Sequence, residues 1–128
     1  PVTLNVLLAE DNQVNQIVAR AMLSKLGCTV TVAKDGNEVL ALTLEHRFDV
    51  ILMDCHMPGM DGFEATRQIR SLMHIHNRPH IVALTADSMP EDRQRCFDAG
   101  MNGFLTKPIR SEELRRLLDS VPAREVAR

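Results

Sequence analysis

The chain has 128 residues, 45% of them hydrophobic and 25% charged, which is enough for one domain with a proper core. Fifteen basic residues against seventeen acidic ones leave a formal net charge of −2, and this balance argues against a general nucleic-acid binder. Three cysteines without CxxC spacing, and apolar runs far below the ~20 residues of a membrane span, predict a soluble domain in a reducing, cytoplasmic setting.

Apolar runs of strand length alternate with segments of helical period along the chain. The expected strands cover residues 4–9, 28–33, 48–53, 81–84 and 103–105. The first helix is predicted from apolar residues three and four apart between Val14 and Leu26, with Gly27 as its left-handed cap. Asp35 with Glu38 is a capping-box pattern for the second helix, expected over residues 37–46. Asp61 with Glu64 and Ser88 with Glu91 repeat this pattern ahead of the third and fourth helices. Gly100 ends the fourth helix, and Ser111 begins the fifth.

Five strands that are each followed by a helix predict right-handed crossovers and a parallel sheet covered on both faces. We therefore expect a flavodoxin-like three-layer α/β/α sandwich, with five strands in the assumed order 2-1-3-4-5 and five helices. In that order, ligands bind at the carboxyl ends of the first and third strands, where the strand order reverses. Glu10, Asp11 and Asp54 stand at those two strand ends.

These three carboxylates predict a metal site. Gathered at one rim of the sheet, they repel one another unless a cation neutralises them, and oxygen ligands open to water suit Mg²⁺ or Mn²⁺. Lys107, after the last strand, supplies a point charge for a phosphate oxygen, and Thr85, after the fourth strand, supplies a hydroxyl donor. A carboxylate can itself attack phosphorus to give an aspartyl phosphate, and transfer then needs little beyond positioning and charge neutralisation.

The same residues belong to a series of short motifs. In chain order these are Glu10-Asp11-Asn12, Asp54 followed by Met57, Pro58, Met60, Asp61 and Gly62, then Thr85-Ala86, and Lys107-Pro108. With this series the chain resembles the receiver domain of two-component response regulators, over residues 4 to about 121. We therefore expect a receiver domain over residues 1–121 and a C-terminal tail or linker over residues 122–128.

The resemblance implies where the metal and the phosphoryl group bind. Asp54 is the expected phosphoacceptor. Asp11, Asp54 and the backbone carbonyl of His56 are the expected direct ligands of the metal, and Glu10 acts mainly through water. Such a module catalyses its own phosphorylation and dephosphorylation, but it serves as a signalling switch.

Thr85 and Lys107 are then expected to bind the phosphoryl oxygens, and Ala86 to leave room for them. In the family, the peptide bond before Pro108 is cis, and an aromatic residue at the position of Phe104 turns inward together with Thr85. Because Phe104 has no tyrosine hydroxyl, its switching is predicted to rest on packing alone. The alternative is that Phe104 is a fixed core residue.

Residues 10–12 continuing into 14–16, and residues 53–58 running on to 63–67, resemble receivers attached to hybrid sensor histidine kinases. A first residue other than Met and the trailing residues 122–128 fit a segment of such a protein. In that subfamily the phosphoryl group passes between a kinase histidine, the receiver aspartate and a histidine-phosphotransfer domain. We expect these two domains as partners, no direct nucleic-acid or membrane contact, and a parent protein that can be anchored in the inner membrane. The expected docking places are the loop after Lys107 and the start of the first helix, near Asn12, Asn15 and Gln16.

Two further expectations concern histidine residues. His56 and Asp87, each two residues beyond a site residue, are expected to flank the path of an attacking water, so replacing either should change the lifetime of the aspartyl phosphate. His74, His76 and His80 are interpreted as a solvated loop rather than a zinc site, because no cysteine or acidic partner completes a tetrahedral set.

Simpler interpretations exist for single residues. Asp11 can cap the first helix, Asp54 can merely end a strand, and Lys107 can be an ordinary solvated lysine.

Other functions fit the sequence less well than a receiver domain. A haloacid-dehalogenase-type phosphatase needs a second aspartate where Gln13 stands, and an FMN binder needs a glycine-rich first loop and aromatic residues. A pseudo-receiver would lack an acidic or lysine position, and a DNA-binding regulator needs an appended effector domain.

Overall fold

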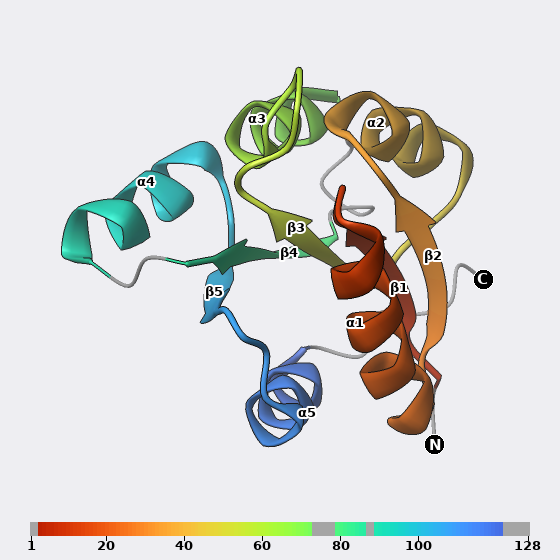
Figure 1. Ribbon diagram of the computed structural model, residues 1–128. Coiled ribbons are helices and arrows are strands. Elements are labelled where there is room, and N and C mark those ends of the chain that lie inside the picture. Colours follow the sequence, from red (N-terminus) through yellow and green to blue (C-terminus); the bar gives the residue numbers. More distant parts are fainter. Residues whose placement is uncertain (1–2, 73–78, 87–88, 122–128) are drawn as a thin grey trace.

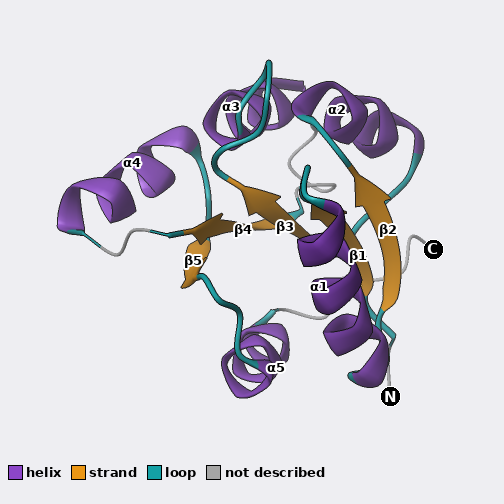
Figure 2. Ribbon diagram, viewed as in Figure 1, coloured by secondary structure: helices purple, strands orange, loops and turns teal. Residues whose placement is uncertain are grey.

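The computed structural model of the protein describes residues 3–72, 79–86 and 89–121, in which strands and helices alternate (Figure 1, Figure 2). The elements are β1 Asn5–Ala9, α1 Gln13–Lys25, β2 Thr29–Ala33, α2 Gly36–Glu45, β3 Val50–Asp54, α3 Gly62–Leu72, β4 His80–Thr85, α4 Pro90–Ala99, β5 Gly103–Thr106 and α5 Ser111–Ser120. Each predicted strand and helix is present, with bounds that shift by one or two residues. Among the described helices, none is both long enough and apolar enough to cross a membrane.

The strands form one parallel sheet in the order β2-β1-β3-β4-β5, which confirms the expected topology. Successive strand side chains point to opposite faces, so each face of the sheet has its own core. Helices α1 and α5 cover one face and α2, α3 and α4 the other (Figure 1). The central strand β3 is buried over all five residues, so Asp54 at its end opens directly onto the rim of the sheet.

Helices α1, α2 and α3 begin at side-chain caps. The side chain of Asn12 accepts a hydrogen bond of 3.0 Å from the backbone N–H of Asn15. Since Asn12 takes this role, the interpretation of Asp11 as the cap of α1 is wrong. Asp35 and Asp61 cap α2 and α3 as predicted, through hydrogen bonds of 2.8 and 2.9 Å.

The start of α4 differs from the prediction. Ser88, the expected cap, lies outside the described residues, and the N-cap position is held by Met89, whose side chain makes no capping hydrogen bond. Pro90 follows at the first helical position, where a missing N–H costs nothing and a fixed φ favours the helix. The predicted left-handed cap at Gly27 is confirmed by its φ of +88°. Gly100 ends α4 as predicted, and it too is left-handed, with a φ of +105°.

Arg70, near the end of α3, joins three segments that are distant in sequence. Its guanidinium donates hydrogen bonds of 2.8 Å to the carbonyls of Pro79 and Gly100 and one of 2.7 Å to the Asn102 side chain. The same Asn102 oxygen accepts the backbone N–H of Ile81 at 2.9 Å. These contacts hold the start of β4 and the turn between α4 and β5 against α3.

The histidine loop is only partly described. His74 and His76 lie outside the described residues, whereas His80 is the half-buried first residue of β4, so its assignment to a solvated loop is wrong. Burial, and secondarily the charge of Arg70, lowers the pKa of His80. The folded state therefore favours neutral His80.

We predict that His80 makes the fold sensitive to mild acid. Because its pKa is depressed on folding, its contribution to stability is present above the unfolded value of about 6.5 and is lost as the pH falls through the lower folded value. Lowering the pH from about 7.5 to about 5.5 should therefore reduce the free energy of unfolding of the wild type more than that of His80→Gln. Urea unfolding at each pH measures this difference. His46→Gln, at an exposed position, is the matched control. Equal losses in wild type and His80→Gln would contradict this prediction.

Candidate functional site

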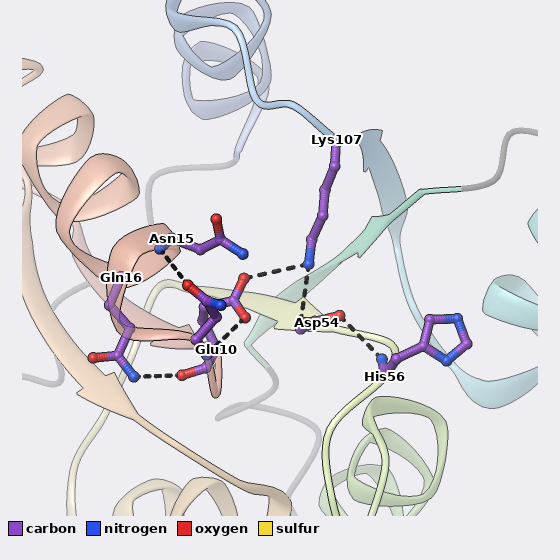
Figure 3. Close-up of polar contacts among 7 residues, drawn as sticks. Glu10, Asn15, Gln16, Asp54, His56 and Lys107 are labelled. Atoms are coloured by element: carbon purple, nitrogen blue, oxygen red, sulfur yellow. Dashed lines mark hydrogen bonds and ion pairs between the residues drawn. The ribbon is translucent and has the colours of Figure 1, made fainter.

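Three carboxylates, from Glu10, Asp11 and Asp54, meet at the carboxyl ends of β1 and β3, where the strand order reverses. Figure 3 shows Glu10 and Asp54 of this cluster. Glu10 and Asp54 are each only 3% exposed, while Asp11 is exposed. One carboxylate oxygen from each of the three lies within 4.8 Å of the others. The backbone of Glu10 stays in register with β2 through a 2.9 Å hydrogen bond to the Ala33 carbonyl, which keeps its side chain at the rim.

Lys107 reaches this cluster from the end of β5. Its ammonium donates to Asp54 Oδ2 at 2.9 Å and to Glu10 Oε1 at 3.3 Å, with 28% of the side chain exposed (Figure 3). A 2.8 Å hydrogen bond from the Lys107 N–H to the Thr85 carbonyl fixes its backbone beside β4. The Lys107–Pro108 bond is cis, as the resemblance implied. Lys107 is therefore not an ordinary solvated lysine.

Burial and neighbouring charges shift the pKa values of Glu10 and Lys107. Burial is the main cause that raises the pKa of Glu10, and the neighbouring Asp54 adds to it, while the Asn12 N–H and Lys107 oppose it. For Lys107, burial alone would lower the pKa, but hydrogen bonds and charge attraction from Asp54 and Glu10 outweigh it, so the pKa is raised. The lysine stays protonated, and three carboxylates counted with one ammonium give the cluster a formal charge of −2. That charge matches one divalent cation.

Backbone groups hold the two buried carboxylates. Asp54 Oδ1 accepts the backbone N–H of His56 at 3.0 Å, and Glu10 Oε2 accepts the N–H of Asn12 at 3.2 Å. Gly62 packs closely against the backbone of Asp54, because a Cβ added at Gly62 would collide with the Asp54 carbonyl oxygen. The motif position of Gly62 is thus explained by close backbone packing, a reason that the sequence did not reveal.

The other predicted site residues lie along the same rim. Thr85 ends β4 and is buried, and Ala86 follows it at an exposed position. The imidazole of His56 is exposed and points away from the carboxylates (Figure 3). Asp87 lies outside the described residues. The structure thus brings Glu10, Asp11, Asp54 and Lys107 into one cluster, with the backbone of His56 beside it.

Phe104 lies on β5, partly buried against the core of one sheet face. The guanidinium carbon of Arg93, from α4, stands 4.9 Å from the centroid of its ring. A cation–π contact therefore holds the ring in addition to packing, and the idea that its switching rests on packing alone stays a prediction. Sequence reasoning missed Arg93, since no motif links an exposed helix arginine to a strand aromatic.

Comparisons with known proteins agree with this geometry. The family model described as "Response regulator receiver domain" matches residues 6–119. The chain is 46% identical to "Histidine protein kinase 1" of Candida albicans, over 92% of the chain and 5% of that protein. It is 45% identical to "Sensor histidine kinase AruS" of Pseudomonas aeruginosa, over 92% of the chain and 12% of that protein. The chain therefore spans only a small fraction of the length of these relatives.

Two solved structures are also similar. One is the receiver domain of sensor histidine kinase PA1611 from Pseudomonas aeruginosa PAO1, described with a magnesium ion coordinated in the active site cleft. It matches with a TM-score of 0.85 and 44% identity over 94% of this chain and 98% of that chain. The other is the receiver domain of Ssk1 in a complex with the histidine phosphotransfer signaling protein Ypd1 of Saccharomyces cerevisiae. It matches with a TM-score of 0.86 and 31% identity, over 93% and 88% of the two chains.

Proposed function

The chain belongs to the family of response regulator receiver domains, the phosphoryl-accepting modules of two-component phosphorelays, and we propose that Asp54 is its phosphoacceptor. The observation that carries this proposal is the buried Asp54 carboxylate, 2.9 Å from the Lys107 ammonium and adjoining two further carboxylates. We also propose that the receiver domain covers residues 1–121 and that residues 122–128 form a tail or linker.

The resident cofactor that fits this cluster is Mg²⁺, for which Mn²⁺ can substitute. The donors are all oxygen atoms, and the formal charge of −2 explains why a divalent ion is preferred to a monovalent one. Asp11, Asp54 and the His56 carbonyl would hold the ion directly, and Glu10 would act through water. When bound, the ion supplies positive charge to the phosphoryl oxygens during transfer.

The reaction that these residues support is transfer from a phosphohistidine. An Asp54 oxygen forms a bond to phosphorus while the bond from phosphorus to the histidine nitrogen breaks, and the electron pair stays on that nitrogen. Lys107 is already beside Asp54 and would exchange this contact for a phosphoryl oxygen. The Thr85 hydroxyl would donate to a second oxygen, and the small Ala86 would leave room for it.

A direct test is to incubate the protein with a small acyl phosphate, with Mg²⁺ or with excess chelator, and to measure the intact mass. We expect a gain of one phosphoryl group with Mg²⁺ and none with chelator. Absence of any gain across a wide range of Mg²⁺ and donor concentrations would overturn the proposed function.

Partner docking is proposed for the face of α1 next to the site. The apolar period of α1 is real, but Val14, Ile17 and Val18 are 68%, 69% and 49% exposed, and only Ala19 and Leu23 are fully buried. A cavity of about 250 Å³ adjoins this face, lined by Glu10, Asn15, Val18, Ala19, Leu84, Lys107, Pro108 and Ile109. We propose that a histidine kinase domain and a histidine-phosphotransfer domain dock here and present a histidine to Asp54. The complex of Ypd1 with the Ssk1 receiver supports this choice of partner.

We predict that Ile17→Asp slows transfer from a phosphorylated histidine-phosphotransfer domain by about 10-fold, because a charge replaces an exposed apolar contact. Phosphorylation by a small acyl phosphate, which needs no docking, should be unchanged. Leu44→Asp, at an equally exposed apolar position on α2, is the matched control. Equal loss with both phosphodonors would mean that Ile17 acts through the fold.

Phe104 is proposed as the residue that reports phosphorylation to a partner. If it turns inward with Thr85, it must leave Arg93, so the cation–π contact favours the unphosphorylated position. We expect Phe104→Ala to leave Asp54 phosphorylation intact and to reduce the difference in partner affinity between the two states. Binding titrations with phosphorylated and unphosphorylated protein measure this difference, with Phe97→Ala as an exposed control. Equal affinities of the two wild-type states would dismiss the switch.

Three proposals concern the surroundings of the reaction. Replacing His56 or Asp87 is predicted to alter the lifetime of the aspartyl phosphate, measured as the rate of mass loss. The parent protein is proposed to be a hybrid histidine kinase. A cytoplasmic location is proposed because the three cysteines, Cys28, Cys55 and Cys96, are all free thiols, which suits a reducing compartment.

A further inference from the structure

Asp11 is exposed, yet both peptide units that flank it are held in place. The carbonyl of Glu10, in the peptide unit before Asp11, accepts a 2.6 Å hydrogen bond from the side-chain amide of Gln16 (Figure 3). The N–H of Asn12, in the peptide unit after Asp11, donates to Glu10 Oε2 at 3.2 Å. Fixing both peptide units fixes the backbone dihedrals of Asp11, and hence the direction in which its carboxylate leaves the chain.

Gln16 is well placed for this contact because of its position in α1. Its own N–H bonds to the Asn12 carbonyl at 2.9 Å, so it lies one turn into the helix. Helix side chains lean toward the N-terminus, which brings the side-chain amide of Gln16 back over the turn that contains Glu10 and Asp11. Asn12 caps the same turn through Asn15, so α1 and the turn before it form one hydrogen-bonded unit.

We propose that Gln16 is a positioning residue for the divalent cation, acting through the Glu10 carbonyl on the direction of the Asp11 carboxylate. This inference rests on the proposed function, because it assigns to Asp11 a role as metal ligand. Without the amide donor, the Glu10–Asp11 peptide unit can rotate, and Asp11 must be ordered again each time an ion binds. Outer-sphere partners of this kind commonly change metal affinity by about 10- to 100-fold.

Two substitutions separate positioning from simple electrostatics. Gln16→Met keeps the length of the side chain and removes the donor. Gln16→Glu also removes the donor, but it adds a negative charge close to the cation. If only charge matters, Gln16→Glu should bind Mg²⁺ more tightly than the wild type. If the donor matters, both variants should bind Mg²⁺ about 10-fold more weakly.

The experiment is a calorimetric titration of each variant with Mg²⁺, paired with the rate of phosphorylation by a small acyl phosphate at increasing Mg²⁺. We expect the half-saturating Mg²⁺ concentration to rise about 10-fold while the rate at saturation stays unchanged. Gln13→Met and Gln13→Glu, at an exposed position in the same turn of α1, are the matched controls. Tighter or unchanged binding by Gln16→Glu would overturn the inference.

A double-mutant cycle identifies the residue through which Gln16 acts. In an Asp11→Asn background, Gln16→Met should change the Mg²⁺ affinity by less than about 2-fold, because the carboxylate that it positions is gone. The full 10-fold effect in that background would also overturn the inference. A wild type that bound no Mg²⁺ would overturn the proposed function itself. A wild type that bound Mg²⁺ only as tightly as Gln16→Met would overturn the inference on Gln16 alone.

Discussion

Asp54→Asn should abolish the gain of a phosphoryl group that the wild type shows with a small acyl phosphate and Mg²⁺. An amide oxygen carries no formal charge and cannot form a stable acyl phosphate, so the nucleophile is lost while the shape of the side chain is kept. The buried position is retained, and the His56 N–H can still donate to the amide oxygen. The measurement is the intact mass of each protein after incubation.

The control for this prediction is Asp119→Asn, which makes the same chemical change at an exposed position on α5. It should be phosphorylated as fast as the wild type. A residual mass gain in Asp54→Asn would mean that another carboxylate accepts the group, and peptide mapping after trapping would identify it. Asp11, the exposed member of the cluster, is then the first residue to inspect.

The sequence allowed the acidic cluster to be predicted because the ends of apolar strands are visible in one dimension. Glu10 and Asp54 each terminate an apolar run, and the parallel order of β1 and β3 is sufficient to bring them to one rim. The same pattern could not show what covers a helix. Val14 and Ile17 repeat at core spacing, yet they are exposed, because periodicity reports that a helix has an apolar face and says nothing of what packs on it.

The predictions that failed depended on contacts that the local sequence does not specify. Asp11 and Asn12 are both good capping residues, and only the turn geometry decides that Asn12 caps α1 and leaves the Asp11 carboxylate exposed. Sequence reasoning also missed the contact between Arg93 on α4 and Phe104 on β5, because the two residues lie in different elements and no motif links them. His80 begins β4 because it pairs through its N–H with the Asp49 carbonyl, a partner that no local pattern near His80 indicates.

Lys107→Met should have two separable effects, one on stability and one on phosphoryl transfer. In the wild type, the ammonium bridges Asp54 and Glu10, and its charge opposes the rise in the pKa of Glu10 that burial causes. Without it, two buried carboxylates face each other with no counter-charge. Breaking buried ion pairs costs about 3–5 kcal/mol, and because the lysine side chain is 28% exposed we expect a smaller loss of about 1–3 kcal/mol in the absence of divalent ions. Urea unfolding with chelator measures this loss.

Adding Mg²⁺ distinguishes a counter-charge from a phosphate ligand. A divalent ion restores positive charge to the carboxylates, so the unfolding free energy of Lys107→Met should recover toward the wild-type value, with a larger Mg²⁺-induced gain than in the wild type. The rate of phosphorylation should stay lower by about 100-fold even at saturating Mg²⁺, because the missing ammonium would contact a phosphoryl oxygen in the transition state. Lys34→Met, which removes an exposed lysine paired with Glu38, should change neither property. Recovery of both stability and rate with Mg²⁺ would reduce Lys107 to a counter-charge and remove it from the transfer step.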